Sequence, residues 1–299
     1  MAPLVPYFEP SDFVLVPERV LGGFPAAAIT LKPFGTLVAL GVYAGSACAV
    51  RHARRLGMNE RVMISLLTWI VISSFVFGHV FDALSYYPDE VRRDPLMLLR
   101  LWEGLSSFGG FAGAVIGGLA WRVRHRTPIF AYADVVASCF PVSWSFGRLG
   151  CSVVHDHPGL RSDAWYAVRY PGGGRLDLGL YELLITLPLM VVFLVLQRKP
   201  RPWGFYLAIM CSYYAPLRFL LDFLRVRPGE GAGPFAAAGD VRYLGLTPAQ
   251  WGCLPLLALG VGAFLQLRRS GTALPPVPAA FARSGPDPEG AGSDSRDER

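Results

Sequence analysis

One short stretch of the chain combines a cationic side chain with several glycines at the end of an apolar run. Residues 145–159 read SFGRLGCSVVHDHPG, and Arg148 lies where apolar residues give way to polar ones. An arginine at such a depth in a membrane is costly unless it has a partner or a ligand. Gly147, Gly150 and Gly159 let the backbone approach a ligand closely. The pattern indicates an anionic, lipid-sized ligand; the alternative is that Arg148 extends to a phosphate head group at the membrane surface.

Two histidines and an aspartate follow in the same stretch and are suited to proton transfer. Imidazole has an unperturbed pKa of about 6.5, in the range that a general base needs at neutral pH. His155, Asp156 and His157 are therefore candidate catalytic residues, with the carboxylate able to orient one of the rings. The alternative interpretation is an exposed polar loop with solvated histidines.

A second arginine lies in a later apolar run. Arg218 precedes Asp222 by four residues, so the two side chains share one face of a helix. This spacing predicts a salt bridge inside the membrane, which is compatible with binding a ligand. Glu182 lies in the first turn of another expected helix, where glutamate is common, so its position alone does not indicate a site.

The five cysteines indicate neither a disulfide framework nor a metal site. They are Cys48, Cys139, Cys151, Cys211 and Cys253, and no two of them form a Cys-x-x-Cys pair. Four lie in apolar runs, where cysteine behaves as a small hydrophobic residue, and Cys151 alone lies in a polar motif. We expect no metal ion and no cofactor.

The composition indicates a protein that crosses a membrane several times. The 299 residues are 53% hydrophobic and 17% charged, whereas a soluble domain carries about 25% charged residues. The mean hydropathy is +0.38. The formal net charge of +6 comes from arginines in short clusters between apolar runs, which is typical of cytoplasmic loops. We therefore expect a membrane bilayer and no nucleic acid among its partners.

Seven apolar runs have roughly the 20 residues that a helix needs to cross the hydrocarbon core. They cover residues 34–50, 62–84, 105–121, 129–146, 178–196, 203–221 and 251–267. The sequence therefore predicts an all-α, polytopic membrane protein with about seven transmembrane helices. In the third run Gly109, Gly113 and Gly117 recur at every fourth position, which predicts close packing against another helix.

The distribution of arginine predicts the orientation of the chain. Arginine clusters follow the first, third, fifth and seventh runs, whereas arginines at the other ends are mixed with acidic residues. This places the N-terminus outside and the C-terminus inside the cell. Residues 1–32 do not resemble a cleaved signal peptide, and we expect an irregular or interfacial segment there. Residues 33–270 then form the transmembrane domain, and residues 271–299 a disordered cytoplasmic tail.

With these motifs placed, the chain resembles one known family, the prolipoprotein diacylglyceryl transferases of bacteria, from about residue 29 to residue 268. The motifs are RLWEG at residues 100–104, SFGGFAG at 107–113, GRLG at 147–150, LYE at 180–182, RFLLDFLR at 218–225 and LTPAQ at 246–250. Each motif is short, and it is their order and spacing together that carry the resemblance.

The chain also departs from the family pattern. Phe34 falls on a tyrosine of the family, Phe108 on its catalytic histidine, Cys151 on an asparagine, and Asp156 and Asp222 on two glutamates. Both phosphate-binding arginines of the family match, as Arg148 and Arg218, and Gly159 closes the signature. The resemblance therefore supports lipid binding by this chain more directly than it supports the catalytic step.

The resemblance implies an enzyme that moves a diacylglyceryl group from phosphatidylglycerol to the lipobox cysteine thiol of prolipoproteins. Its partners would be phosphatidylglycerol and prolipoprotein signal peptides. It would lie in the bacterial inner membrane, with a periplasmic N-terminus and a cytoplasmic C-terminus. Substrate binding would fall to Arg148, Arg218, Asp222 and Gly159.

Two other interpretations stay open at this point. The first is a lipid-binding paralogue without catalysis, because the family histidine is absent at Phe108. The second is an unrelated small-molecule transporter, because transporters also bury arginine–aspartate pairs. We find no internal repeat of the kind that many transporters show.

Overall fold

The structure, a computed structural model, is mainly helical. It describes residues 3–8, 10–16, 19–21, 24–26, 29–100, 104–126, 129–226 and 242–270. The predicted disordered tail over 271–299 lies outside the described residues, as do Trp102 and Glu103 of the RLWEG motif. The side chain of Phe108 also lies outside the described part, although its backbone belongs to a helix.

Seven long helices in the described residues correspond to the seven predicted apolar runs. They are α1 (Pro33–Arg55), α2 (Glu60–Tyr86), α4 (Ser107–His125), α5 (Ile129–Val154), α6 (Leu178–Leu196), α7 (Phe205–Leu221) and α8 (Pro248–Ser270). Three short helices extend or connect them: α3 (Pro88–Arg93), η1 (Pro95–Leu99) and η2 (Asp222–Leu224). Local signals set the starts, since Pro33 and Pro248 open α1 and α8 and the Asn59 side chain caps α2.

Six of the described helices are long and apolar enough to cross a membrane. They are α1, α2, α5, α6, α8 and the continuous segment formed by α7 and η2. The polytopic, helical fold class predicted from the sequence is thus confirmed. Helix α4 is not among the six, because its glycines and its closing arginines lower its hydropathy, so the predicted count of seven is not confirmed.

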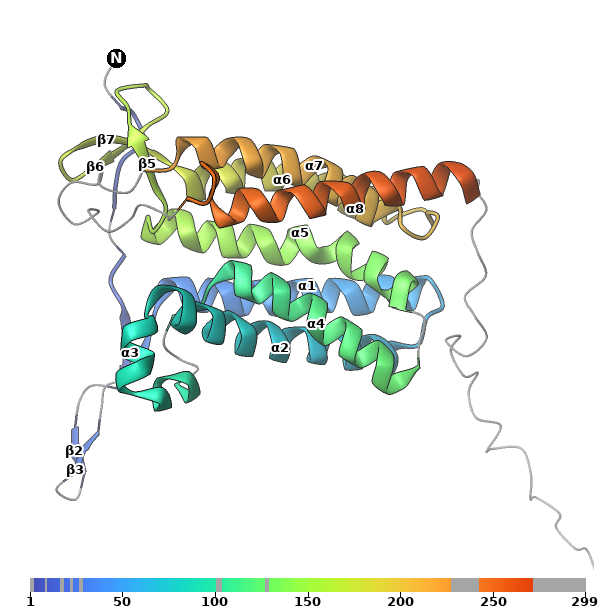
Figure 1. Cartoon of the computed structure of the whole chain (residues 1–299), viewed down its shortest axis with the longest axis horizontal. Coiled ribbons are helices and arrows are strands. Elements are labelled where there is room, and N and C mark those ends of the chain that lie inside the picture. Colours follow the sequence, from blue (N-terminus) through green and yellow to red (C-terminus); the bar gives the residue numbers. More distant parts are fainter. Residues whose placement is uncertain are drawn as a thin grey trace, which may run out of the picture.

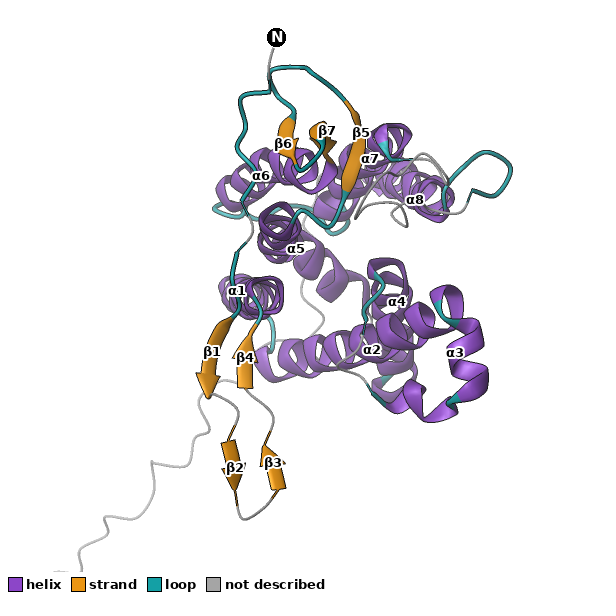
Figure 2. Cartoon of the chain, turned by 90° about the vertical axis from the view of Figure 1, so that its left-hand side faces the viewer, coloured by secondary structure: helices purple, strands orange, loops and turns teal. Residues whose placement is uncertain are grey.

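Helix α5 lies in the middle of the molecule. It packs against α1 on one side and against α6 and α7 on the other (Figures 1 and 2). Helices α2 and α4 pair beside α1, while α7 and α8 form a second pair. Large apolar side chains are exposed on the outward faces, for example Leu184, Val195 and Phe264. Such faces suit contact with lipid tails.

The glycines of α4 let it pack closely on α2, as their spacing predicted. A Cβ atom at Gly109 would lie 2.6 Å from the Phe77 carbonyl oxygen, and one at Gly117 would lie 2.8 Å from that of Trp69. At Gly113 it would lie 2.8 Å from the Phe77 Cβ atom. These distances are shorter than a carbon atom tolerates, so the absence of a side chain is what allows the contact.

The arginine clusters gather at one end of the bundle. Consecutive long helices run in alternating directions, so the C-terminal ends of α1, α4, α6 and α8 lie together (Figure 1). Arginines of the last turn or the residues just beyond it are Arg54, Arg55, Arg122, Arg124, Arg198, Arg268 and Arg269. The arginine clusters that predict the orientation from the sequence are therefore also gathered at one end of the folded molecule.

The N-terminal segment contains strands where we expected irregular structure. Strand β1 (Phe13–Val16) pairs with β4 (Ile29–Leu31), and β2 (Arg19–Leu21) pairs with β3 (Phe24–Ala26), both antiparallel. Valine, isoleucine and threonine in these segments favour extended backbone. The pairs form a ribbon that leads to the start of α1 (Figure 2).

A three-stranded sheet covers the end of α5 and the start of α6. Its order is β5 (Pro158–Arg161), β7 (Gly173–Asp177) and β6 (Val168–Tyr170), all antiparallel. The N-terminus joins it through a parallel bridge between Val5 and Val168. The Arg169 amide donates to the Val5 carbonyl at 3.0 Å. The N-terminus and residues just beyond the middle of the chain thus share one layer.

Candidate active site

Arg148 lies inside α5 rather than at its mouth. The apolar run ends near residue 146, but the helix continues to Val154 and stops where His155 adopts a left-handed backbone with φ of 52°. The Arg148 side chain is 6% exposed. Its guanidinium carbon lies 4.3 Å from the Trp144 ring centre, a cation–π contact one turn earlier. The arginine is therefore buried and does not extend to the surface.

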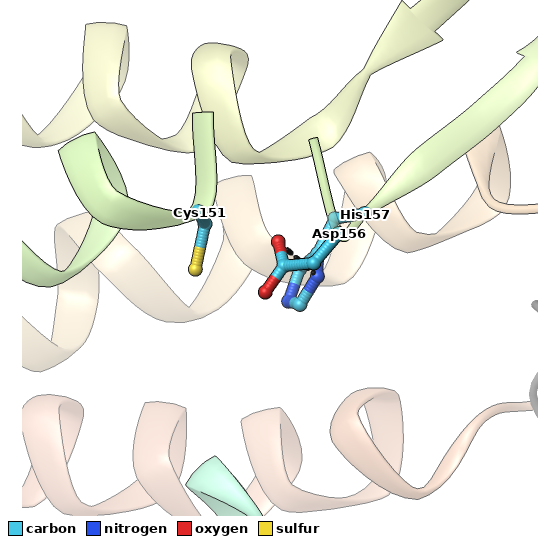
Figure 3. Close-up of side chains that lie close together, drawn as sticks. All are labelled: Cys151, Asp156 and His157. Atoms are coloured by element: carbon cyan, nitrogen blue, oxygen red, sulfur yellow. Dashed lines mark ion pairs between the residues drawn. The ribbon is translucent and has the colours of Figure 1, made fainter. Parts of the chain in front are cut away.

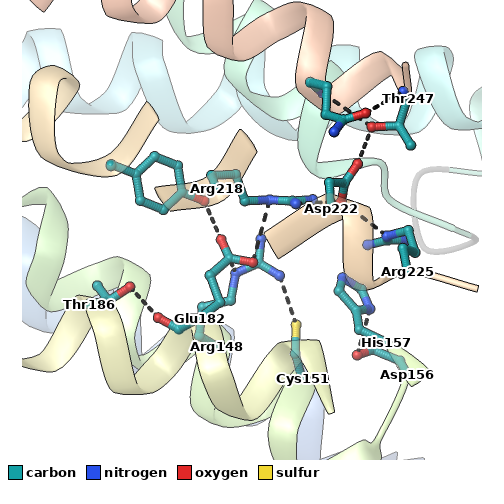
Figure 4. Close-up of polar contacts among 12 residues, drawn as sticks. Arg148, Cys151, Asp156, His157, Glu182, Thr186, Arg218, Asp222, Arg225 and Thr247 are labelled. Carbon is teal, nitrogen blue, oxygen red and sulfur yellow. Dashed lines mark hydrogen bonds and ion pairs between the residues drawn. The ribbon is translucent and has the colours of Figure 1, made fainter. Parts of the chain in front are cut away.

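Glu182 connects the two arginines that the sequence singles out (Figure 4). The Arg148 Nε atom lies 3.1 Å from Glu182 Oε1, and the Arg218 Nε atom lies 3.6 Å from Oε2. The Tyr214 hydroxyl donates to the same carboxylate. Glu182 is buried and holds α5, α6 and α7 together through charged groups. A buried charge of this kind persists only when it is paired.

Asp222 forms a second centre of the same network. It accepts from Arg218 Nη1 at 2.5 Å and from Arg225 Nε at 3.2 Å, so the predicted salt bridge between Arg218 and Asp222 is present. The Thr247 hydroxyl also donates to Asp222. Thr247 and Gln250 form a capping box at the start of α8, with backbone-to-side-chain hydrogen bonds of 3.0 and 3.2 Å. The LTPAQ motif thus anchors α8 to the network.

We call Arg148, Glu182, Arg218, Asp222 and Arg225 the arginine centre. Their side chains are between 0% and 13% exposed. Three guanidinium groups and two carboxylates thus lie together in these five described residues. In a medium of low dielectric constant, guanidinium groups attract an anion strongly. Guanidinium groups also match the geometry of phosphate oxygens and stay charged at all relevant pH values.

His155 is placed in a different environment from the arginine centre. Its Nδ1 atom lies 2.6 Å from Asp177 Oδ2, and its ring stacks on Tyr7 at 4.5 Å. The Tyr170 hydroxyl donates to the same carboxylate at 2.9 Å. Burial and the Asp177 charge raise the pKa of Tyr170, which keeps its proton for this bond. Asp177 also accepts from the Leu180 amide and caps α6, so this group fixes the sheet onto the helix.

Asp156 and His157 turn back toward the end of α5. The His157 Nδ1 atom lies 2.9 Å from Asp156 Oδ1, and the two side chains are 23% and 37% exposed, respectively. One polar atom from each of these residues and the Cys151 sulfur all lie within 4.8 Å of one another (Figure 3). Arg148 Nη1 donates to that sulfur at 3.6 Å. The histidine pair of the sequence is thus split, with only His157 beside the arginine centre.

Gly159 lies where three segments meet. It pairs with Arg225 in an isolated antiparallel bridge, and a Cβ atom there would lie 2.8 Å from the carbonyl oxygens of Leu176 and Leu224. Arg175 Nη1 donates to the Gly159 carbonyl at 3.2 Å. The glycine therefore allows β5 to approach the segment that follows α7 and carries Arg225.

Sequence reasoning missed three residues that connect the site. Glu182 lies in a motif that we noted, but its position in a first helical turn had an ordinary explanation. In the sequence, Asp177 and Thr247 each precede an apolar run, which is the pattern expected of a helix N-cap. Phe34 packs on the α5 backbone, 3.0 Å from where a Gly150 Cβ atom would lie. The side chain of Phe108 lies outside the described part of the chain.

Comparisons with known proteins agree on one family. A family model described as prolipoprotein diacylglyceryl transferase matches residues 24–266. A protein of Chromohalobacter salexigens is 30% identical over 254 residues, covering 81% of this chain and 92% of the relative. One of Polynucleobacter asymbioticus is 32% identical over 222 residues, covering 73% and 81%. One of Pseudomonas aeruginosa is 26% identical over 249 residues, covering 81% and 91%. All three are named phosphatidylglycerol–prolipoprotein diacylglyceryl transferase.

Proposed function

Because this chain belongs to the prolipoprotein diacylglyceryl transferase family, we propose that it transfers the diacylglyceryl group of phosphatidylglycerol to the lipobox cysteine thiol of prolipoproteins. The observation that carries the proposal is the arginine centre, in which the buried guanidinium groups of Arg148 and Arg218 lie on either side of Glu182. The phosphodiester of phosphatidylglycerol is an anion whose oxygens suit the donors of such groups.

The reaction needs a stabilised leaving group. The thiol sulfur attacks the glyceryl carbon, the bond from that carbon to the phosphate oxygen breaks, and glycerol phosphate leaves with the electron pair. Negative charge grows on the phosphate in the transition state. Arg148 and Arg218, held in place by Glu182, supply fixed donors for that charge. One such preorganised donor typically lowers a barrier by about 3 kcal/mol.

The acceptor thiol must also lose its proton, because a thiol of pKa about 8.5 is only a few per cent ionised at neutral pH. We propose that His157, oriented by Asp156, serves this step, since the pair lies beside Cys151 and the arginine centre. For His155 we propose a positioning role, because its Nδ1 atom is bound to Asp177 and its ring is stacked on Tyr7.

Asp222 and Gly159 position the centre in this proposal. Asp222 aligns Arg218 and Arg225, and Gly159 brings β5 to the backbone of Arg225. We place the protein in the bacterial inner membrane with the N-terminus in the periplasm and the C-terminus in the cytoplasm. Arg148 and Arg218 lie near the C-terminal ends of α5 and α7, at the end of the bundle opposite the C-terminal ends of α1, α4, α6 and α8 (Figure 1). In this orientation the arginine centre faces the periplasmic leaflet.

The test is diacylglyceryl transfer from phosphatidylglycerol to a lipobox peptide by the purified protein. Arg148→Lys keeps the charge but loses the planar fork, so we expect transfer to fall about 100-fold while the protein stays folded. Arg122→Lys at the opposite end of the bundle is the matched control and should leave the rate unchanged. Wild-type turnover in Arg148→Lys contradicts the proposed role. Retained lipid binding with no transfer by the wild type favours a lipid-binding paralogue.

A further inference from the structure

Three potential metal ligands of different kinds meet beside the arginine centre. Cys151 comes from the last turns of α5, and Asp156 and His157 come from the loop that follows. Their sulfur, oxygen and nitrogen atoms lie within 4.8 Å of one another, and Figure 3 shows the three side chains close together. Cys151 is buried, whereas the other two side chains are partly exposed. The cluster is therefore not sealed inside the protein.

The donor set matches zinc. Zn²⁺ binds thiolate, imidazole and carboxylate, and three protein ligands with an open fourth position are typical of catalytic zinc sites. With a Zn–S bond of about 2.3 Å and Zn–N or Zn–O bonds of about 2.0–2.2 Å, tetrahedral ligand atoms lie about 3.3–3.8 Å apart. To bind an ion, the contact of 2.9 Å between His157 Nδ1 and Asp156 Oδ1 would have to lengthen and both side chains would have to turn toward the Cys151 sulfur; both are partly exposed.

The charges around the cluster also accommodate a dication. A thiolate at Cys151 and the carboxylate of Asp156 together balance the two charges of Zn²⁺, so the occupied cluster is neutral. Arg148 Nη1 already donates to the Cys151 sulfur at 3.6 Å, so a metal-bound thiolate there would keep a charged hydrogen-bond donor. The Arg148 charge is itself paired with Glu182.

We propose that Cys151, Asp156 and His157 hold a zinc ion whose open fourth position takes the acceptor thiol. This deepens the proposed transferase function and rests on it. A thiol that coordinates zinc is deprotonated. The ion, rather than the free His157 imidazole, would then ionise the acceptor thiol. All five histidines are described, and of these His157 is the one beside the Arg148–Cys151 contact.

The step balances without another reactant. The acceptor thiol binds the ion as a thiolate and releases its proton to water. The sulfur donates an electron pair to the glyceryl carbon, and the carbon–oxygen bond to the phosphate breaks. The electron pair leaves with glycerol phosphate, held by Arg148 and Arg218. The product is a thioether, a weaker ligand than a thiolate, so it can dissociate and leave the fourth position free.

Cobalt provides a direct readout of the site that does not depend on activity. Protein purified without a polyhistidine tag is stripped with a chelator and titrated with Co²⁺ in lipid nanodiscs. The wild type should bind one ion and show a sulfur-to-cobalt charge-transfer band with the intense visible bands of tetrahedral Co²⁺. The band should disappear in Cys151→Ser, and His157→Ala should weaken binding about 100-fold or more. Cys211→Ser, at a buried thiol in α7, is the matched control and should keep the band.

Transfer rates then separate the zinc site from the proposed function. At pH 7 the metal-free wild type should transfer at least about 10-fold more slowly than the zinc-loaded protein, and the difference should shrink toward pH 9 as the thiol ionises by itself. No thiolate band in the wild type overturns the zinc site, as does full transfer by metal-free protein, which assigns proton removal to His157 alone. A cobalt band in a protein that transfers nothing upholds the site and overturns the proposed function instead.

Discussion

At the scale of single residues, the Glu182 side chain balances two buried arginines. It accepts from Tyr214 and lies against Arg148 and Arg218, with 2% of its side chain exposed. By fixing the two guanidinium groups, this carboxylate also fixes the direction of their remaining N–H donors. Ligand binding and the packing of α5, α6 and α7 therefore both depend on the Glu182 carboxylate.

Replacing Glu182 by glutamine should destabilise the protein strongly. The amide keeps the size but removes the charge, which leaves Arg148 and Arg218 buried without their shared carboxylate. Breaking such a buried pair typically costs about 3–5 kcal/mol, and thermal unfolding in detergent measures the loss. The matched control is Glu60→Gln, whose partner Arg54 is 56% exposed, where only a small shift in melting temperature is expected because solvent screens the pair. Equal shifts in the two variants would argue against a structural role for the Glu182 charge.

We expect substitutions of His155 and His157 to have different effects. His157→Ala alone should lower transfer about 100-fold or more, the usual effect of removing a general base or its equivalent. His155→Ala should mainly lower the thermal stability, because it removes the contacts to Asp177 and Tyr7. Transfer kinetics and melting curves of both variants test this. A larger rate loss in His155→Ala than in His157→Ala would reverse the assignment.

The sequence predicted some residues of the site and not others, for a physical reason. Arg148, Arg218 and Asp222 stand out because a charge in an apolar run needs a partner. Glu182 and Asp177 do not stand out, because an acidic residue at the start of a helix already has a local explanation. Their function depends on side chains more than 20 residues away, which the spacing of one segment cannot reveal.

At the scale of elements, the pairing of α2 and α4 depends on the glycines of α4, which have no side chain. Gly113→Ala would place a methyl group 2.8 Å from the Phe77 Cβ atom, and overpacking of this kind typically costs about 1–3 kcal/mol. In α8, a Cβ atom at Gly262 meets nothing within 4 Å, so Gly262→Ala should stabilise its helix by roughly 0.5–1 kcal/mol. Unfolding in a denaturing detergent compares the two, and a stabilised Gly113→Ala would refute the close packing.

The helices were predictable as elements, whereas the sheets were not. Each apolar run became a helix because a span of about 20 residues must satisfy its own backbone within the bilayer. The N-terminal strands are only three or four residues long and pair with each other, β1 with β4 and β2 with β3. Such short strands leave little signal in local sequence, and the bridge from Val5 to Val168 joins residues far apart in the chain, so we expected an irregular segment there.

At the scale of the whole molecule, the arginine clusters predict which end faces the cytoplasm. An alkaline phosphatase fused after Arg269 should be inactive, and a green fluorescent protein at the same position should fluoresce, because the C-terminal end of α8 lies with the other clusters. A fusion in the loop between β5 and β6 should give the opposite pair of results. Phosphatase activity after Arg269 would invert the proposed orientation.

The strand contact of the N-terminus has a consequence for biosynthesis. Tyr7 stacks on His155, and the Val5 carbonyl accepts from the Arg169 amide. A ribosome adds roughly 5–20 residues each second, so residues 3–8 must wait on the order of 10–30 s for these partners to be made. During that interval Val5 and Tyr7 lack the partners that they have in the folded protein. The N-terminal contact can therefore form only after β6 has been translated, at a time when helices α6, α7 and α8 are still to be made.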